Sequence, residues 1–320
     1  MKHVFVFDSK SFRNQNWKMD GILDHIGQFF RTQDKPDFSI QFSRYRRDAI
    51  VIIQEEVEKA KPDDIVRIYA IGGEEVLFDC LNGVAHFDNM ELAAVPHGEW
   101  SDFLSIFGDD KADMFRDIPT IVQAEALPTD IIKWGVNYAL NSCYIGLNSA
   151  TISSLKSLKT SLNKGIFRVF SKISSSFKHI MTAFDKQIAA QKYQIFIDDK
   201  DYTGNYSLIH VANGPYYAGK KTGALLASPD DGLLDVTLLK SAGVLKTTWS
   251  IRSYSRGKRP SNGIFLQAKK VSIKSDKQMW IQMDNESFKD TNIELKVVPR
   301  AVNMVAVNNL SYPTVSTSVL

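Results

Sequence analysis

The segment Val66-Arg67-Ile68-Tyr69-Ala70-Ile71-Gly72-Gly73-Glu74-Glu75-Val76-Leu77-Phe78-Asp79-Cys80-Leu81-Asn82-Gly83 decides the fold of the chain. An apolar run of strand length ends in two glycines, and the apolar residues after them recur at helical spacing. The segment therefore predicts a strand, a tight turn and the start of a helix. In an open α/β sheet, ligands bind at the carboxyl end of such a strand, and the helix start behind it favours anions. Any α/β unit can turn on glycines, so the pair alone does not identify a ligand.

The residues around this segment predict a doubly wound parallel sheet. Residues 4–7 and 38–42 have strand character, and residues 17–30 and 49–60 have the periodicity of amphipathic helices. The order β-α-β-α before the glycine pair, with right-handed crossovers, gives parallel strands covered on both faces. A further strand, turn and helix start follow over residues 92–104.

The second half of the chain reads mainly as antiparallel β-structure. A short strand is expected at residues 121–125, and one helical interruption at residues 153–191. The other expected strands are residues 139–145, 193–197, 206–213, 234–239, 270–273, 280–283 and 293–298.

Composition places the chain among globular proteins with two domains. It has 320 residues, of which 44% are hydrophobic and 23% charged, and a formal net charge of +3. This charge is too small to indicate a nucleic-acid partner. Cys80 and Cys143 lie far apart in apolar segments, which predicts buried thiols in a reducing compartment. We expect no signal peptide and no transmembrane segment.

Four motifs occur in an order that resembles one known family. They are Gly72-Gly73-Glu74-Glu75-Val76, Pro96-His97-Gly98-Glu99-Trp100-Ser101-Asp102-Phe103, Asp230-Asp231-Gly232-Leu233-Leu234-Asp235, and Gln282-Met283-Asp284-Asn285-Glu286. They resemble the Gly-Gly-Asp-Gly-Thr, Pro-x-Gly-Thr-x-Asn-Asp-Phe, Asp-Gly-Leu-Leu-Asp and Asp-Gly-Glu motifs of the diacylglycerol kinase catalytic-domain family. This family comprises bacterial lipid kinases related to sphingosine kinases, and the resemblance spans nearly the whole chain.

The resemblance implies a nucleotide-binding α/β domain packed against an antiparallel β-sandwich lipid domain, with the active site in the cleft between them. We therefore expect these domains over residues 1–127 and 128–298, a return segment on the first domain over residues 299–312, and a tail over residues 313–320. The implied activity is ATP-dependent phosphorylation of a lipid hydroxyl with Mg²⁺, the acceptor being diacylglycerol-like.

The resemblance also assigns the site residues. Asp284 is the expected general base, together with Glu286. The positions expected to bind the nucleotide are Gly72, Gly73, Glu74, Gly98, Ser101 and Asp102. The positions expected to bind magnesium are Asp231, Asp235 and Glu74. Without the resemblance, Asp284 reads as a polar hairpin turn, and Asp231 and Asp235 as a solvated loop.

Three residues depart from the family motifs where phosphates are expected, and they leave a second interpretation open. Glu75 replaces a glycine that lets backbone approach phosphate, Val76 replaces a hydroxyl donor, and Glu99 replaces a threonine. A carboxylate about 4 Å from a phosphate opposes it by roughly 4 kcal/mol per unit charge at an effective dielectric constant near 20. The alternative is a pseudokinase that has lost ATP binding and acts as a lipid-binding or regulatory protein. A dinucleotide-binding oxidoreductase is disfavoured because the chain lacks Gly-x-Gly-x-x-Gly.

Residues 153–186 indicate where the protein works. This segment interleaves many lysines with aromatic and aliphatic residues and contains one acid, Asp185. Such a stretch can lie on an anionic membrane, as a lipid substrate requires, or it can be a helix pair that covers the sandwich. We therefore expect a cytoplasmic protein associated peripherally with the membrane, with a homodimer left open.

Overall fold

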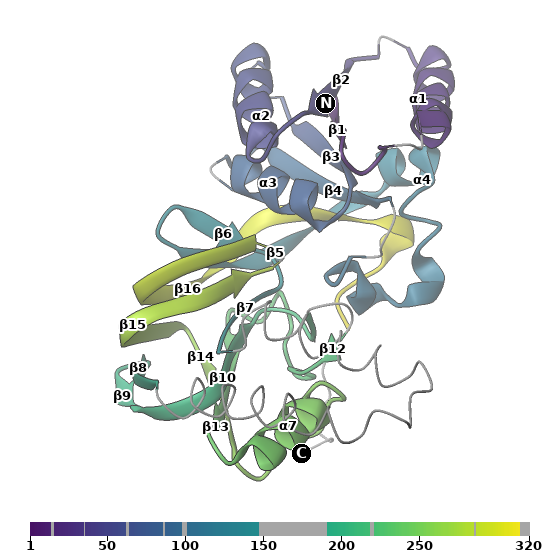
Figure 1. Ribbon diagram of the computed structural model, residues 1–320. Helices are drawn as coiled ribbons and strands as arrows, with labels where there is room; N and C mark the ends of the chain where they lie inside the picture. Colours follow the sequence, from purple (N-terminus) through teal and green to yellow (C-terminus); the bar gives the residue numbers. More distant parts are fainter. Residues whose placement is uncertain are drawn as a thin grey trace, which may run out of the picture.

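The computed structural model has an α/β half and a mainly antiparallel β half (Figure 1). It describes residues 1–13, 16–34, 36–61, 64–85, 87–97, 101–146, 191–217, 221–284 and 286–313. Within these residues, no helix is both long and apolar enough to cross a membrane.

The α/β half contains four parallel strands in the order β2-β1-β3-β4. The strands are β1 (Lys2–Asp8), β2 (Phe38–Ser43), β3 (Val66–Gly72) and β4 (Met90–Pro96). Every residue of β3 is buried, which is expected of a central parallel strand covered on both faces. Arg67 remains buried because its guanidinium binds the Glu91 carboxylate at 2.6 Å and the carbonyl oxygens of Ile121 and Val122.

Helices cover both faces of this sheet. They are α1 (Asn16–Arg31), α2 (Asp48–Lys59), α3 (Glu74–Val84) and α4 (Ile118–Gln123). Helices α1 and α4 contact each other on one side, and α2 and α3 contact each other on the other side (Figure 1). The expected doubly wound arrangement is therefore confirmed. The helix start expected before residue 104 is instead a 3-10 helix, η1 (Leu104–Phe107), followed by η2 (Asp109–Lys111).

The second half is antiparallel. Its strands are β5 (Glu125–Trp134), β6 (Asn137–Ala139), β7 (Ser142–Ile145), β8 (Lys192–Ile197), β9 (Lys200–Asp201), β10 (Gly204–Ala212), β11 (Tyr216–Tyr217), β12 (Lys221–Thr222), β13 (Leu234–Lys240), β14 (Gly263–Ala268), β15 (Lys270–Met283) and β16 (Glu286–Ala306). Among the described residues, the helix α7 (Val244–Tyr254) packs on this half, and η4 (Val307–Asn309) follows β16.

Strand β16 joins the two halves. It pairs antiparallel with β15 and β5 and then parallel with β4, so hydrogen-bonded strands run without interruption from one half to the other. One apolar cluster contains most buried residues of the α/β half together with residues of β5 and β16, and a second contains most of those of the β half together with Phe78 of α3. Two small clusters complete the β half. A site between the halves therefore rests on a shared sheet.

Two expected elements are wrong in ways that the local chemistry explains. Residues 121–125 were expected as a strand, but α4 covers most of them, because Asp117 caps its start by accepting the Thr120 N–H at 3.0 Å and Pro119 stands in its first turn. Residues 139–145 were expected as one strand, but the chain breaks between β6 and β7. At this break, backbone N–H groups bind the side chain of Asp284.

The other differences concern strand length and one helix. The strands expected at residues 270–273 and 280–283 are one strand, β15, whose register shifts between Lys274 and Met279. Strand β16 extends well beyond residues 293–298 on both sides. Strand β14 and helix α7 were not expected. The helix expected at residues 153–191 lies outside the described residues, apart from residue 191.

Candidate functional site

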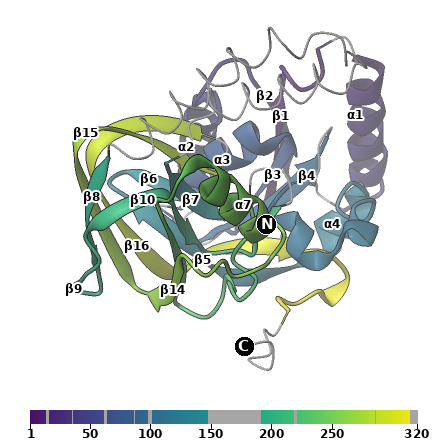
Figure 2. The ribbon, with the colours of Figure 1, turned by 60° about the horizontal axis from the view of Figure 1, so that its bottom comes forward.

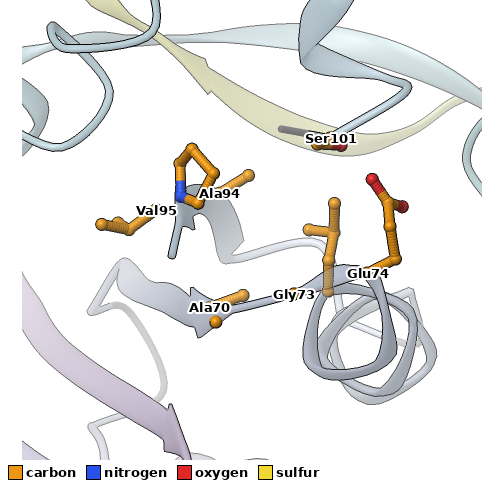
Figure 3. A pocket seen from close by; sticks show the side chains of 9 residues that line it. Ala70, Gly73, Glu74, Ala94, Val95 and Ser101 are labelled. Carbon is orange, nitrogen blue, oxygen red and sulfur yellow. The ribbon is translucent and has the colours of Figure 1, made fainter. Parts of the chain in front are cut away.

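A small pocket, open to solvent, lies at the carboxyl ends of β3 and β4. The residues that line it are Ala70, Gly72, Gly73, Glu74, Leu77, Ala94, Val95, Pro96 and Ser101. Figure 3 shows the Glu74 side chain reaching from the helix start towards Ser101. Among these nine described lining residues, Glu74 is the only charged one. The glycine pair thus lines a small crevice at the carboxyl end of β3, where the sequence predicts ligand binding.

The start of α3 can accept an anion at this pocket. Gly73 is the N-cap residue, and no side chain caps the helix within the described residues. The first-turn N–H groups of a helix lack partners inside the helix, so they remain available to a phosphate. A Cβ atom on Gly72 would lie 2.9 Å from the Cβ of Asp8, and φ of Gly72 is +153°. Only glycine therefore brings the backbone this close to the loop after β1.

Glu75 does not face the pocket. Its side chain is 58% exposed, and its carboxylate lies 3.8 Å from the ammonium group of Lys10 in the loop after β1. The repulsion expected between this carboxylate and a bound phosphate is therefore partly screened by Lys10 and by solvent. Val76 is buried and supplies no hydroxyl. Gly98 and Glu99 lie outside the described residues.

Asp284 occupies a left-handed backbone position, with φ of 46°, between β15 and β16. Its carboxylate accepts three backbone N–H groups, from Leu140 at 2.7 Å, Asn141 at 3.0 Å and Ser142 at 2.8 Å. These bonds fix both carboxylate oxygens and favour the charged form. Burial acts more strongly in the opposite direction, so the pKa of Asp284 rises to about 6.

Glu74, Asp102 and Asp284 interact electrostatically with one another. The Asp102 N–H donates to the Glu74 carboxylate at 2.9 Å, which fixes the loop after β4 against the start of α3. Burial raises the pKa of Glu74 to about 7, and the negative charges of Asp284 and Asp102 add to this rise. Asp102 also raises the pKa of Asp284. The structure therefore brings Gly72, Gly73, Glu74 and Ser101 to one pocket, with Asp102 and Asp284 near enough to Glu74 to raise its pKa.

Glu286 forms an ion pair with a residue of the α/β half. Its buried carboxylate binds the guanidinium of Arg46, which precedes α2. The next residue, Arg47, donates its backbone N–H to Asp79 at 2.7 Å, and its guanidinium lies 4.9 Å from the centre of the Phe78 ring. Glu286 thus fastens the β15–β16 hairpin to the α/β half.

Asp231 and Asp235 lie in the loop before β13 and at its start. Burial raises the pKa of both carboxyls, that of Asp235 to about 6. Asp231 accepts the Leu233 N–H at 2.9 Å. The described residues contain no group of three or more His, Cys, Asp or Glu side chains placed to hold a metal ion. Asp231 with Asp235, and Glu74 separately, stay predictions as metal-binding positions.

Asp130 organises the loop that contains Asp231. Its fully buried carboxylate accepts the Gly232 N–H at 2.6 Å and the Arg300 N–H at 2.7 Å. Arg300 has a left-handed backbone, with φ of 51°. Asp130 was not predicted from the sequence, because it lies inside β5 and carries no motif. Arg46 was not predicted either, although the adjacent basic residues before α2 were a visible signal.

A family model described as the YegS C-terminal NAD kinase beta sandwich-like domain matches residues 170–306. Two curated relatives, from Staphylococcus aureus strains JH9 and N315, are both named as a "putative lipid kinase". Each is 29% identical over 281 residues, which cover 85% of this chain and 87% of the relative. The resemblance to the diacylglycerol-kinase-like family is confirmed.

Solved structures are similar to this chain in fold. One, titled "Crystal structure of a putative diacylglycerol kinase from Bacillus anthracis str. Sterne", has a TM-score of 0.70 and 20% sequence identity. The matched residues cover 96% of this chain and 97% of the Bacillus anthracis chain. A second structure of a diacylglycerol kinase from Bacillus anthracis str. Sterne has a TM-score of 0.65 and 20% identity, with the same coverage of both chains. Both expected halves, α/β and β-sandwich, are therefore confirmed.

Proposed function

We propose that this diacylglycerol-kinase-like protein is a lipid kinase that transfers a phosphoryl group from ATP to the hydroxyl of a diacylglycerol-like lipid. The observation that carries the proposal is the position of Asp284. Its carboxylate is fixed by three backbone N–H groups, and its charge raises the pKa of Glu74, which lies in the uncapped first turn of α3 beside the glycine turn. A fixed base beside an anion-binding turn suits phosphoryl transfer.

In this proposal, Asp284 takes the proton of the acceptor hydroxyl. The hydroxyl oxygen bonds to the γ-phosphorus of ATP as the bond from that phosphorus to ADP breaks, and ADP leaves. A carboxyl pKa near 6 keeps Asp284 ionised at neutral pH and makes it a stronger base than an exposed aspartate. The backbone of Gly72 and Gly73 and the first turn of α3 would hold the phosphates. This leaves the lipid hydroxyl to approach from the β half.

Magnesium fits this site only together with the nucleotide. Mg²⁺ is commonly held by one or two carboxylates plus substrate phosphates, and Glu74 and Asp102 provide that number. Bound there, the ion would neutralise phosphate charge. Asp231 and Asp235 remain candidates for a separate ion that would order their loop.

A second candidate function, a pseudokinase that binds lipid without using ATP, is favoured by one observation. The described lining of the nucleotide pocket contains no lysine or arginine, and its one charged side chain is an acid. A phosphate would therefore depend on backbone N–H groups and on a metal.

Calorimetric titration with ATP, with and without Mg²⁺, separates the two candidates. The kinase proposal predicts magnesium-dependent binding, at roughly micromolar Kd, that is lost in Gly72→Ala. Absence of heat at about millimolar nucleotide, with the protein folded, would make the pseudokinase the better account. Asp198→Asn, on the far side of the β half, serves as the control variant.

A further inference from the structure

Helix α7 exposes a tryptophan between two cations. Trp249 is 62% exposed and lies on the side of α7 opposite to Thr247 and Tyr254, which are fully buried. Lys246 precedes Trp249 by three residues and Arg252 follows it by three, and both are exposed. Residues three apart are neighbours on a helix surface, so the indole has a cation on each side.

Exposed basic and apolar residues continue past the end of α7. Arg256 and Lys258 are exposed, and residues 244–259 contain no acid. Leu225 is 46% exposed and lies beside this turn, since a Cβ atom on Gly257 would be 2.7 Å from its Cδ1. We call Lys246, Trp249, Arg252, Arg256, Lys258 and Leu225 the α7 surface. No ion pair involves its cations within the part of the chain that the structure describes.

We infer that the α7 surface docks the protein on an anionic phospholipid bilayer. An isolated exposed apolar side chain is ordinary and indicates nothing by itself. Here, however, unpaired cations flank the indole and no acid interrupts them, so the surface is complementary to a negatively charged plane. Tryptophan is enriched at the headgroup level of membranes, and each nearby Lys or Arg strengthens binding to anionic lipid.

The location of α7 fits a lipid substrate, and this step rests on the proposed function. Figure 2 shows α7 lying across the β half, and Figure 1 shows it at the opposite end of the molecule from α1 and α2. Beneath α7, the hydroxyl of Tyr254 lies 2.7 Å from Nδ1 of His210. The rings of His210 and Tyr144 are in contact, and Asp284 is among the neighbours that raise the pKa of Tyr144, after burial. These aromatic residues connect α7 to β7, and the first residue of β7, Ser142, donates its N–H to the proposed base.

Cosedimentation with vesicles tests the docking directly, without nucleotide or turnover. Vesicles of phosphatidylcholine with phosphatidylglycerol should bind the full chain, and pure phosphatidylcholine vesicles should not. Lys246→Gln with Arg252→Gln should lower the partition coefficient roughly 25-fold, at about fivefold per charge. Trp249→Ala should lower it about tenfold. Raising the salt from about 0.1 M to about 0.5 M should weaken binding of the wild type more than of the charge variant.

Trp17 on α1 provides a matched control. It is 71% exposed and Lys18 lies over its ring at 5.4 Å, but acids follow on the same helix. Trp17→Ala should leave vesicle binding unchanged. Unchanged binding in both α7 variants would overturn the proposal and direct attention to the basic residues 153–186. Equal affinity for duplex DNA and for anionic vesicles would also overturn it. Neither result depends on kinase activity, so the proposed function can fail separately.

Discussion

Replacing Asp284 by asparagine removes the proposed base while keeping the size of the side chain. A positioned general base contributes about 10²–10⁴-fold to a reaction rate. We therefore expect Asp284→Asn to lower kcat at least a hundredfold with little change in KM for ATP. The assay is transfer of radiolabelled phosphate from ATP to diacylglycerol in mixed micelles at pH 8.

The stability of this variant can be worked out from the contacts of Asp284. Burial raises its pKa from 3.8 to about 6, so at pH 8 the charged form costs the folded state roughly 3 kcal/mol, at about 1.4 kcal/mol per pKa unit. Asparagine removes this cost. Its amide nitrogen then faces one of the three backbone N–H donors, which costs about 1–3 kcal/mol. The two effects oppose each other, so the midpoint of urea unfolding should change little.

Asp198 offers a matched control. Like Asp284, it has a left-handed backbone, with φ of 43°, and its carboxylate accepts backbone N–H groups, from Lys269 at 3.0 Å and Lys270 at 2.9 Å. It is exposed and belongs to the turn after β8. Asp198→Asn should keep full activity. If Asp284→Asn retained kcat within about threefold of the wild type while folded, the base assignment would be refuted.

Further perturbations address the neighbouring contacts. The rate of phosphoryl transfer should fall about tenfold per pH unit below pH 6, because protonation of Asp284, whose pKa is about 6, removes the base. A rate that stays constant from pH 5 to 8 would contradict this. Arg46→Gln should lower the free energy of unfolding by about 1–2 kcal/mol, since it leaves the buried Glu286 unpaired, and a double-mutant cycle with Glu286→Gln should show coupling. Asp130→Asn should destabilise by about 2–4 kcal/mol in urea titration, because two N–H donors lose a charged acceptor. Gly72→Ala should abolish nucleotide binding and have a smaller effect on vesicle binding. Unchanged nucleotide affinity would contradict the proposal that the Gly72-Gly73 turn holds the phosphates.

The glycine turn and the antiparallel half could be predicted because their signals are local. The run from Val66 to Gly72 is apolar throughout, and parallel strands covered on both faces have that pattern. Helix α4 could have been found from Asp117 and Pro119, but the β-branched residues after them indicated a strand. Helix α7 was missed because its buried side is partly polar, with Thr247 and Ser250 fully buried, so its sequence lacks a clear apolar stripe.

The candidate site was predicted less completely because it depends on contacts distant in sequence. Asp284 was named, but its three N–H donors lie more than 140 residues earlier, at a break that reads as continuous strand. Glu286 was expected to act together with the base, and its ion pair with Arg46, 240 residues away in sequence, could not be predicted. Asp130 carries no motif, and only the fold brings Gly232 and Arg300 to it. Such pairings follow from topology, which a single sequence does not reveal.

The most direct test of the proposed function is incorporation of labelled phosphate into lipid. The purified wild-type chain, incubated with labelled ATP, Mg²⁺ and diacylglycerol in anionic mixed micelles, should form a phosphorylated lipid, and Asp284→Asn should form at least a hundredfold less. Absence of lipid product from the wild type, with ATP bound, would contradict the proposed acceptor. Absence of both product and ATP binding would contradict the kinase itself and leave the pseudokinase as the better account.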